Sequence, residues 1–189
     1  MKIYSHENLS LHRPLPYFSY GKMHEPLEIP ERMVEFLKAP AALGLEVTTA
    51  IDVGIGPILA VHDFGYVEFL KHGYDDWMAV EEDLGVQVQT GIFVPYDNPG
   101  IGIMAKAAKY QADDSAPISE HSWTSIYWSA QTALNAAEAL LNDKASDIER
   151  ADSHVQLCFS RPPGHHARKS AAGGFCYLNN AAIIAEHLR

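Results

Sequence analysis

The most regular pattern of apolar and polar positions in this chain runs from about Ser122 to Leu141 and predicts an α-helix. Apolar side chains recur there at intervals of three and four residues, which is the repeat of one helix face. The positions in this stripe are Trp123, Ile126, Tyr127, Ala130, Ala133, Leu134, Ala137, Leu140 and Leu141. Such a stripe is typical of a packing face rather than of a cofactor site, and the polar residues 142–144 end the helix.

Two shorter apolar runs predict strands. One covers residues 2–5 and the other residues 154–159. In the second run Val155, Leu157 and Phe159 occupy alternate positions, which is the repeat of a strand.

Three further helices are expected around these strands. Pro30 stands at the first position of one helix, where a missing backbone N–H does no harm. A second helix begins at Gly56 and runs through Leu70, and a third covers residues 178–188. A strand preceded and followed by helices is the repeating unit of a parallel sheet covered on both faces, so the fold class expected is α/β.

Two long stretches lack these patterns and are expected to be mostly loop. Residues 6–28 are polar and carry prolines with several aromatic side chains, while residues 81–118 mix Gly, Pro, Asp and Gln with short apolar groups. Loops of that length are often functional. The chain has no internal repeat, and an apolar fraction of 47% in 189 residues predicts one folded domain over residues 1–189.

Charge and cysteine content narrow the classes of partner. The net charge of −10 argues against nucleic acid and suits a cationic ligand, although ordinary solubility explains the same acidic excess. Two cysteines do not make a disulfide framework, and Cys158 in an apolar run is typical of a buried thiol. Without a bilayer-length apolar stretch or an apolar leader, no membrane partner and a cytoplasmic location are expected.

The segment with the clearest chemistry is Arg161-Pro162-Pro163-Gly164-His165-His166-Ala167, directly after the second expected strand. Open α/β sheets place their active sites in loops at the carboxyl ends of strands. The prolines fix φ, and Gly164 permits a conformation that other residues resist, so both histidines are expected on a bent, largely preset backbone. Imidazole titrates near neutral pH, and two adjacent rings can divide the roles of base and charge stabiliser. Two histidines alone would favour a solvated loop; the flanking prolines and glycines favour catalysis.

Together with Gly173-Gly174-Phe175-Cys176-Tyr177-Leu178-Asn179-Asn180, this segment resembles the active-site signature of the zinc-dependent deacetylases of the histone deacetylase superfamily. Residues 61–70, VHDFGYVEFL, are similar to a helical segment of the acetylpolyamine amidohydrolase branch, and residues 30–32 and 118–119 resemble the same branch less specifically. The resemblance covers nearly the whole chain in the expected order. It implies an arginase/deacetylase-like fold, with three layers in which helices flank a parallel sheet.

The resemblance implies a hydrolase that removes acetyl groups from acetylated amines, either acetylpolyamines or acetyl-lysine. Zinc would polarise the amide carbonyl and lower the pKa of the attacking water. His166 would be the general base, while His165 would stabilise the developing charge and protonate the leaving amine. Gly174 would line the substrate channel with its backbone and Phe175 with an aromatic wall suited to a methylene chain. Arg32 would be a buried arginine beside the channel floor.

The family's zinc ligands are an Asp-x-His pair and a later aspartate, all downstream of this signature, and a catalytic tyrosine follows them. None has a counterpart before Arg189, and the other Cys, His, Asp and Glu residues lack ligand companions at a recognisable spacing. No metal ligand is therefore expected in this chain, and the chain alone is expected to be inactive. It would be the N-terminal part of a deacetylase catalytic domain, or a second polypeptide would supply the rest. A sheet incomplete on its C-terminal side exposes an edge, which favours a homo-oligomer.

Asp113 and Asp114 lie in the loop before the long helix, where the resembled branch carries acidic groups at the channel mouth. A carboxylate there would select a small substrate whose far end is cationic. A solvated turn is the alternative for either aspartate, and the sequence does not choose between the two residues.

Two other functions remain open from the sequence. A non-catalytic module could keep the channel wall and bind amines or a partner protein, and its binding of amines would be insensitive to chelators. A cysteine hydrolase would use Cys176 with one of the histidines and would need a thiolate close to imidazole. The apolar, aromatic context of Cys176 disfavours that thiolate.

Overall fold

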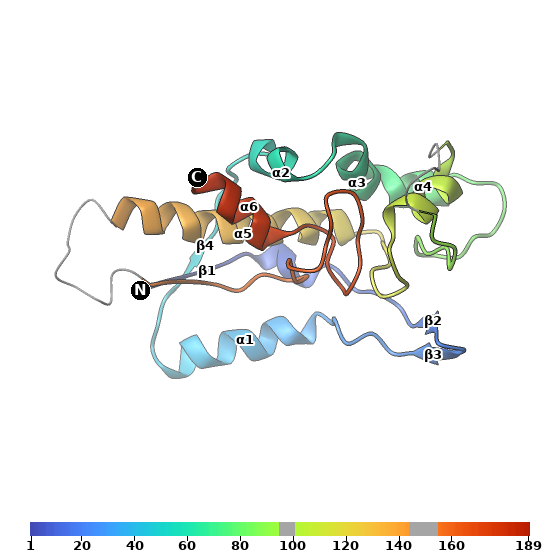
Figure 1. Ribbon diagram of the computed structural model, residues 1–189. Coiled ribbons are helices and arrows are strands. Elements are labelled where there is room, and N and C mark those ends of the chain that lie inside the picture. The colour runs from blue at the N-terminus through green and yellow to red at the C-terminus, as the bar shows by residue number, and fades with distance from the viewer. Residues whose placement is uncertain (95–100, 144–154) are drawn as a thin grey trace.

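The structure is a computed structural model that describes residues 1–94, 101–143 and 155–189 (Figure 1). Its central sheet has three strands in the order β4 (Val47–Thr49), β1 (Lys2–Ser5) and β5 (Gln156–Cys158), and all three are parallel. The strand predicted at residues 2–5 is confirmed. The one predicted at 154–159 is confirmed at its centre, and residue 154 lies outside the described residues.

Helices cover the sheet on both sides. Helix α5 (Ser122–Asp143) lies along one side, together with α6 (Asn180–His187), α2 (Gly56–Val61) and α3 (Phe64–Met78), while α1 (Glu31–Ala42) lies on the other side of the strands (Figure 1). Parallel strands between helical layers confirm the predicted α/β class. In the described part of the chain β5 pairs only with β1, so its far edge is the open side of the sheet.

A row of polar side chains on α5 holds the segment that follows β4. Asn135 accepts a hydrogen bond from the backbone N–H of Ile51 (3.0 Å) and donates one to the Ile51 carbonyl (2.8 Å). Gln131, one turn away, accepts from the Val53 N–H (2.7 Å) and donates to the Gly54 carbonyl (3.0 Å). These side-chain amides replace the hydrogen bonds that a neighbouring strand would make, because each satisfies one donor and one acceptor of the extended backbone. The chain is thereby led to α2 and to His62 at its end.

Several elements differ from the predicted ones. The helix predicted over residues 56–70 is two helices, α2 and α3, which are separated at His62 and Asp63. The stretch 81–118 contains helix α4 (Ile103–Tyr110), whose short length and flanking glycines concealed its buried face of Ile103, Ala107 and Ala108. Residues 6–28 contain the 3-10 helix η1 (Glu7–Ser10) and an antiparallel hairpin of β2 (Tyr17–Ser19) and β3 (Lys22–His24). The prediction of loop is wrong for these segments.

The apolar core lies between α3, α5 and α6. Tyr66 and Leu70 from α3 and Leu134 from α5 are fully buried there, and Ile183 from α6 closes the group. The buried Tyr66 hydroxyl donates to the Tyr177 carbonyl (2.5 Å), so the segment that bears the double-glycine motif is anchored to the core. No helix of the described residues is long and apolar enough to span a bilayer.

Candidate active site

The tandem histidines lie on the loop that joins β5 to α6, at the carboxyl end of the strand. Both His165 and His166 are exposed, and their ring centroids are 4.2 Å apart with the planes inclined by 51°. The location agrees with the sequence prediction. Two accessible imidazoles this close can act on the same small group.

A buried arginine anchors the start of this loop. The Arg161 guanidinium donates to the backbone carbonyls of Leu9 (2.7 Å), His12 (2.5 Å) and Glu28 (3.2 Å). Its Nε lies 2.6 Å from Oε1 of Glu28 in an ion pair, although the angle between the two groups is not that of a hydrogen bond. Burial lowers the pKa of Arg161, while the Glu28 carboxylate opposes that change. Arg161 thus connects the loop that carries the two histidines to the N-terminal segment.

Gly164 is needed for space and not for an unusual backbone angle. Its φ lies outside the left-handed region, so the glycine is required by a close approach of another side chain. A Cβ at this position would lie 2.3 Å from Cγ of the buried Asn180. The Asn180 amide donates to Ser129 (2.8 Å), whose hydroxyl donates to the Pro162 carbonyl (2.7 Å), so the asparagine is not free to move away.

Replacing Gly164 by alanine is expected to lower the free energy of unfolding by about 1–3 kcal/mol, because the new methyl group displaces Asn180. The measurement is chemical denaturation followed by circular dichroism. In an Asn180→Gly background the added methyl group meets space, so the same substitution should cost much less there. Equal costs in the two backgrounds would contradict the packing explanation.

A tight turn at residues 173–176 faces the histidines. The N–H and carbonyl of Gly173 exchange hydrogen bonds with those of Cys176 (2.9 and 3.0 Å), and the central residues Gly174 and Phe175 have φ of 58° and 66°. Positive φ at both central positions is the requirement of a type I′ turn. A Cβ on Gly174 would come within 2.8 Å of Cδ2 of His166, so the glycine lets the backbone approach the imidazole.

Three neighbouring cavities connect this turn to the hairpin through the two aspartates. The first, of about 230 Å³, holds His166 and Asp113, and the second, of about 200 Å³, is shared by Asp113 and Asp114. The second cavity is also lined by Tyr17, Ser19, Tyr20, His24 and Ser115. Burial raises the pKa of the Asp114 carboxyl, and the Asp113 carboxylate adds to the increase.

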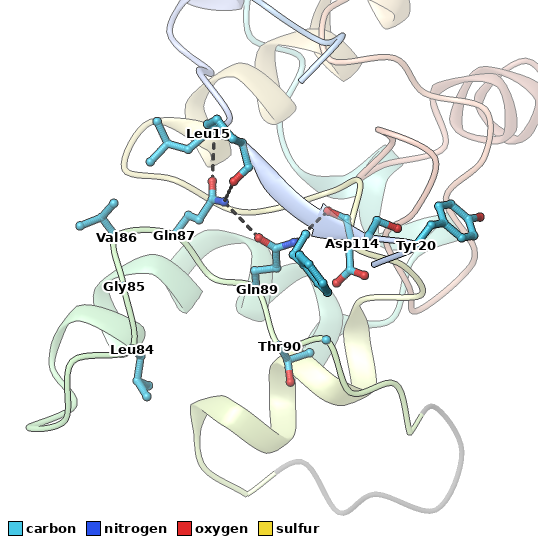
Figure 2. A pocket seen from close by; sticks show the side chains of 13 residues that line it. Leu15, Tyr20, Leu84, Gly85, Val86, Gln87, Gln89, Thr90 and Asp114 are labelled. Atoms are coloured by element: carbon cyan, nitrogen blue, oxygen red, sulfur yellow. Dashed lines mark hydrogen bonds between the residues drawn. The ribbon is translucent and has the colours of Figure 1, made fainter. Parts of the chain in front are cut away.

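The third cavity, of about 640 Å³, includes Asp114 and is shown in Figure 2. Two glutamines form a chain of hydrogen bonds along this cavity. Gln87 accepts from the Leu15 N–H (3.0 Å) and donates to Gln89 (3.1 Å). Gln89 in turn donates to the backbone carbonyl of Asp114 (3.3 Å). The sequence analysis did not single out the hairpin residues Tyr17, Tyr20 and His24 as site residues; the aromatic run in residues 17–20 was the signal.

The histone deacetylase domain model matches residues 27–189 of the chain. The chain belongs to the histone deacetylase family. It is 48% identical to the acetylpolyamine amidohydrolase of Burkholderia pseudomallei (strain 1710b) over 189 residues, which is 100% of this chain and 53% of the relative. Acetylpolyamine amidohydrolase 1 of Pseudomonas aeruginosa is 37% identical over 171 residues, 88% of this chain and 46% of the relative. The chain spans about half the length of these curated relatives.

Solved structures agree with this assignment. One is the crystal structure of acetylpolyamine aminohydrolase from Burkholderia pseudomallei, which matches this chain with a TM-score of 0.91 at 46% sequence identity. The match covers 100% of this chain and 53% of that protein. The HDA15 HD domain, at 18% identity, matches with a TM-score of 0.66 over 44% of its length and supports the fold alone. The described sheet and helices are therefore a partial deacetylase fold.

His62 contacts the loop that carries the tandem histidines through both of its ring nitrogens. Its buried ring accepts a hydrogen bond at Nε2 from the Asn179 N–H (2.9 Å), and Nδ1 lies 3.1 Å from the Lys169 carbonyl. An acceptor at Nε2 requires the neutral ring with its proton on Nδ1. Burial lowers the pKa of His62 and so favours that form. This residue fastens both ends of the segment between the histidines and α6.

The site corrects one sequence expectation, the burial of Arg32, and supports another, the unsuitability of Cys176 as a nucleophile. Arg32 was expected to be buried, but its side chain is 43% exposed and pairs with Glu28 at 2.6 Å, because Arg161 occupies the buried position next to the same carboxylate. The Sγ of Cys176 is fully buried and lies 3.4 Å from the backbone N–H of His165. A thiol enclosed in this way cannot reach a substrate, which argues against the cysteine hydrolase.

The described residues do not fit a zinc site on their own. Within residues 1–94, 101–143 and 155–189, no three or more His, Cys, Asp or Glu side chains are grouped so that they could hold a metal ion. Zinc dependence is general in the histone deacetylase family.

Proposed function

We propose that residues 1–189 are the N-terminal part of the catalytic domain of an amidohydrolase that releases acetate from acetylated amines. The observation that carries the proposal is the packing of the tandem histidines against the Gly174–Phe175 turn, in a chain 48% identical along its whole length to an acetylpolyamine amidohydrolase. Hydrolysis of an unactivated amide requires, among other groups, an accessible general base and a surface that orients the substrate beside it.

In this proposal the two histidines have separate roles. His166 takes the proton of the attacking water, and His165, with its ring centroid 4.2 Å away, stabilises the developing charge and protonates the leaving amine. The half-buried Phe175 lies along the methylene chain of the substrate, and Gly174 contributes its backbone to the wall. The zinc ligands expected from the family would lie after Arg189 or on another polypeptide.

The substrate class that we favour is an acetylpolyamine, a small amide with a cationic far end. Asp114 lines a cavity with the aromatic side chains of Tyr17, Tyr20 and His24, and a carboxylate among aromatic rings suits an ammonium group. The net charge of −10 favours the same cationic substrate over nucleic acid. Two free cysteines suit the expected cytoplasmic location.

The test is acetate release from N-acetylputrescine and from an acetyl-lysine peptide by the protein purified from its own source. We expect turnover of the acetylpolyamine, and we expect His166→Ala to lower kcat about 10²–10⁴-fold, the usual contribution of a general base. His72→Ala is the matched control, because His72 is a half-exposed histidine on α3 that contacts Glu68.

Binding of acetylputrescine without acetate release, insensitive to chelators, would replace the hydrolase by the amine-binding module. Full activity in His166→Ala would remove this histidine from the role of base. Native mass spectrometry of the same preparation reports chain length, partner polypeptides and bound zinc, and so identifies the source of the remaining residues.

A further inference from the structure

The carboxylate of Asp113 is occupied by the chain itself. Its Oδ2 accepts a hydrogen bond from the backbone N–H of Gly174 (2.9 Å). Its Oδ1 accepts from both the N–H (2.9 Å) and the hydroxyl (2.6 Å) of Ser115. Three donors on one carboxylate leave little capacity for a substrate ammonium group.

Ser115 extends this arrangement to the second central residue of the turn. The Ser115 hydroxyl, which donates a hydrogen bond to Asp113, also accepts one from the Phe175 N–H (3.2 Å). The two central N–H groups of the turn therefore both end on the Asp113–Ser115 pair, across about sixty residues of sequence. The pair supports an unusual backbone, because φ of 66° at the non-glycine Phe175 is a conformation that side-chain-bearing residues rarely adopt.

Neither Gly173 nor Gly174 has room for a side chain. A Cβ on Gly173 would lie 2.8 Å from Oδ2 of Asp113, and a Cβ on Gly174 would lie 2.8 Å from Cδ2 of His166. Gly174 thus donates its N–H to the Asp113 carboxylate and also packs against the His166 imidazole. A displacement of the turn would change the place of the wall and the space of the His166 ring together.

We propose that Asp113, through Ser115, is a positioning residue that sets the Gly174–Phe175 turn against His166, and that it is not a ligand of the substrate. Its importance for catalysis rests on the proposed function, whereas the positioning itself does not. The neighbouring Asp114 lines the same hairpin cavity but differs in its contacts, because its backbone carbonyl accepts a hydrogen bond from Gln89, whereas the Asp113 carboxylate accepts one from Gly174.

The experiment is amide hydrogen exchange by NMR on the 189-residue chain, without substrate. In Asp113→Ala we expect exchange at Gly174 and Phe175 to accelerate about tenfold or more, since each loses a charge-assisted or linked hydrogen bond. Asp113→Asn keeps an oxygen acceptor and should restore much of the protection. Asp114→Asn, the matched control, should leave both amides unchanged, and Leu134 in the core of α5 reports global stability.

The His166 ring resonances provide a second readout, because they should shift in Asp113→Ala and return in Asp113→Asn. Unchanged exchange at Gly174 in Asp113→Ala, or equal acceleration in Asp114→Asn, would overturn the proposal. If Asp113→Ala does not fold, Ser115→Ala decides: faster exchange at Phe175 with Leu134 unchanged supports the proposal, and unchanged exchange at Phe175 overturns it. Because no turnover is needed, a failure here is distinguishable from a failure of the proposed function.

Discussion

Replacing Arg161 by methionine should destabilise the folded chain by about 3–5 kcal/mol, because the buried Glu28 carboxylate loses its buried partner and keeps only the half-exposed Arg32. The Arg161 and Glu28 side chains are 1% and 3% exposed. The substitution also deprives the carbonyls of Leu9 and His12 of their donors. Each buried acceptor left unpaired adds a desolvation cost of about 1–3 kcal/mol, so the loss exceeds that of an ordinary ion pair.

The measurement is urea unfolding followed by circular dichroism. Arg13→Met is the matched control: Arg13 pairs with Glu31 at 3.1 Å, but both side chains are largely exposed, so about 1 kcal/mol or less should be lost. Adding Glu28→Leu to Arg161→Met removes the buried carboxylate that has lost Arg161, so part of the stability should be recovered. Equal effects of the two arginine substitutions would show that burial of the Arg161 pair does not matter.

Local patterns were sufficient for the helix α5 and for the loop that carries the histidines. The repeat of Ile126, Ala130 and Leu134 lies within one helix, and all three are buried as predicted. The tandem histidines follow a strand within a few residues, so their location at its carboxyl end needed no tertiary information. Their catalytic roles come from the family resemblance and stay a prediction.

Contacts between distant segments could not be predicted in this way. Arg161 was visible in the motif, but its partners Leu9 and His12 are about 150 residues away, so its burial had no local signal. The opposite error occurred at Arg32, where a motif suggested burial that the ion pair with Glu28 does not provide. Asp113 stood out as an acid in a loop, but its hydrogen bond to Gly174 exists only after the fold brings the two loops together.

Acid should unfold the chain through a buried histidine at the same junction. Burial, together with the smaller effect of the Arg161 charge, lowers the pKa of His12 from 6.5 to about 3. The neutral ring is held by Ser122 at Nδ1 (2.8 Å) and by the Tyr177 hydroxyl at Nε2 (3.3 Å). Since the Tyr177 hydroxyl donates to the Pro117 carbonyl, Nε2–H is the donor and Nδ1 the acceptor.

The direction of the pH effect follows from the two pKa values. Between pH 6.5 and about 3 the unfolded chain binds a proton at His12 that the folded chain does not, so stability falls as the pH falls through this window. The stabilisation is fully present above pH 6.5. A difference of this size is worth about 4–5 kcal/mol, on the scale of the whole stability of a small domain. The lowered pKa of His62 acts in the same direction.

His12→Gln isolates this contribution, because glutamine can occupy the site without titrating. The variant should be less stable at pH 7 but should lose less stability between pH 6.5 and 4, as measured by urea unfolding at several pH values. His121→Gln is the control, since the His121 side chain is 55% exposed, and its pH dependence should match that of the parent. If the slopes of His12→Gln and the parent agree, the acid sensitivity in this window belongs to other groups, such as His62, whose pKa is also lowered by burial.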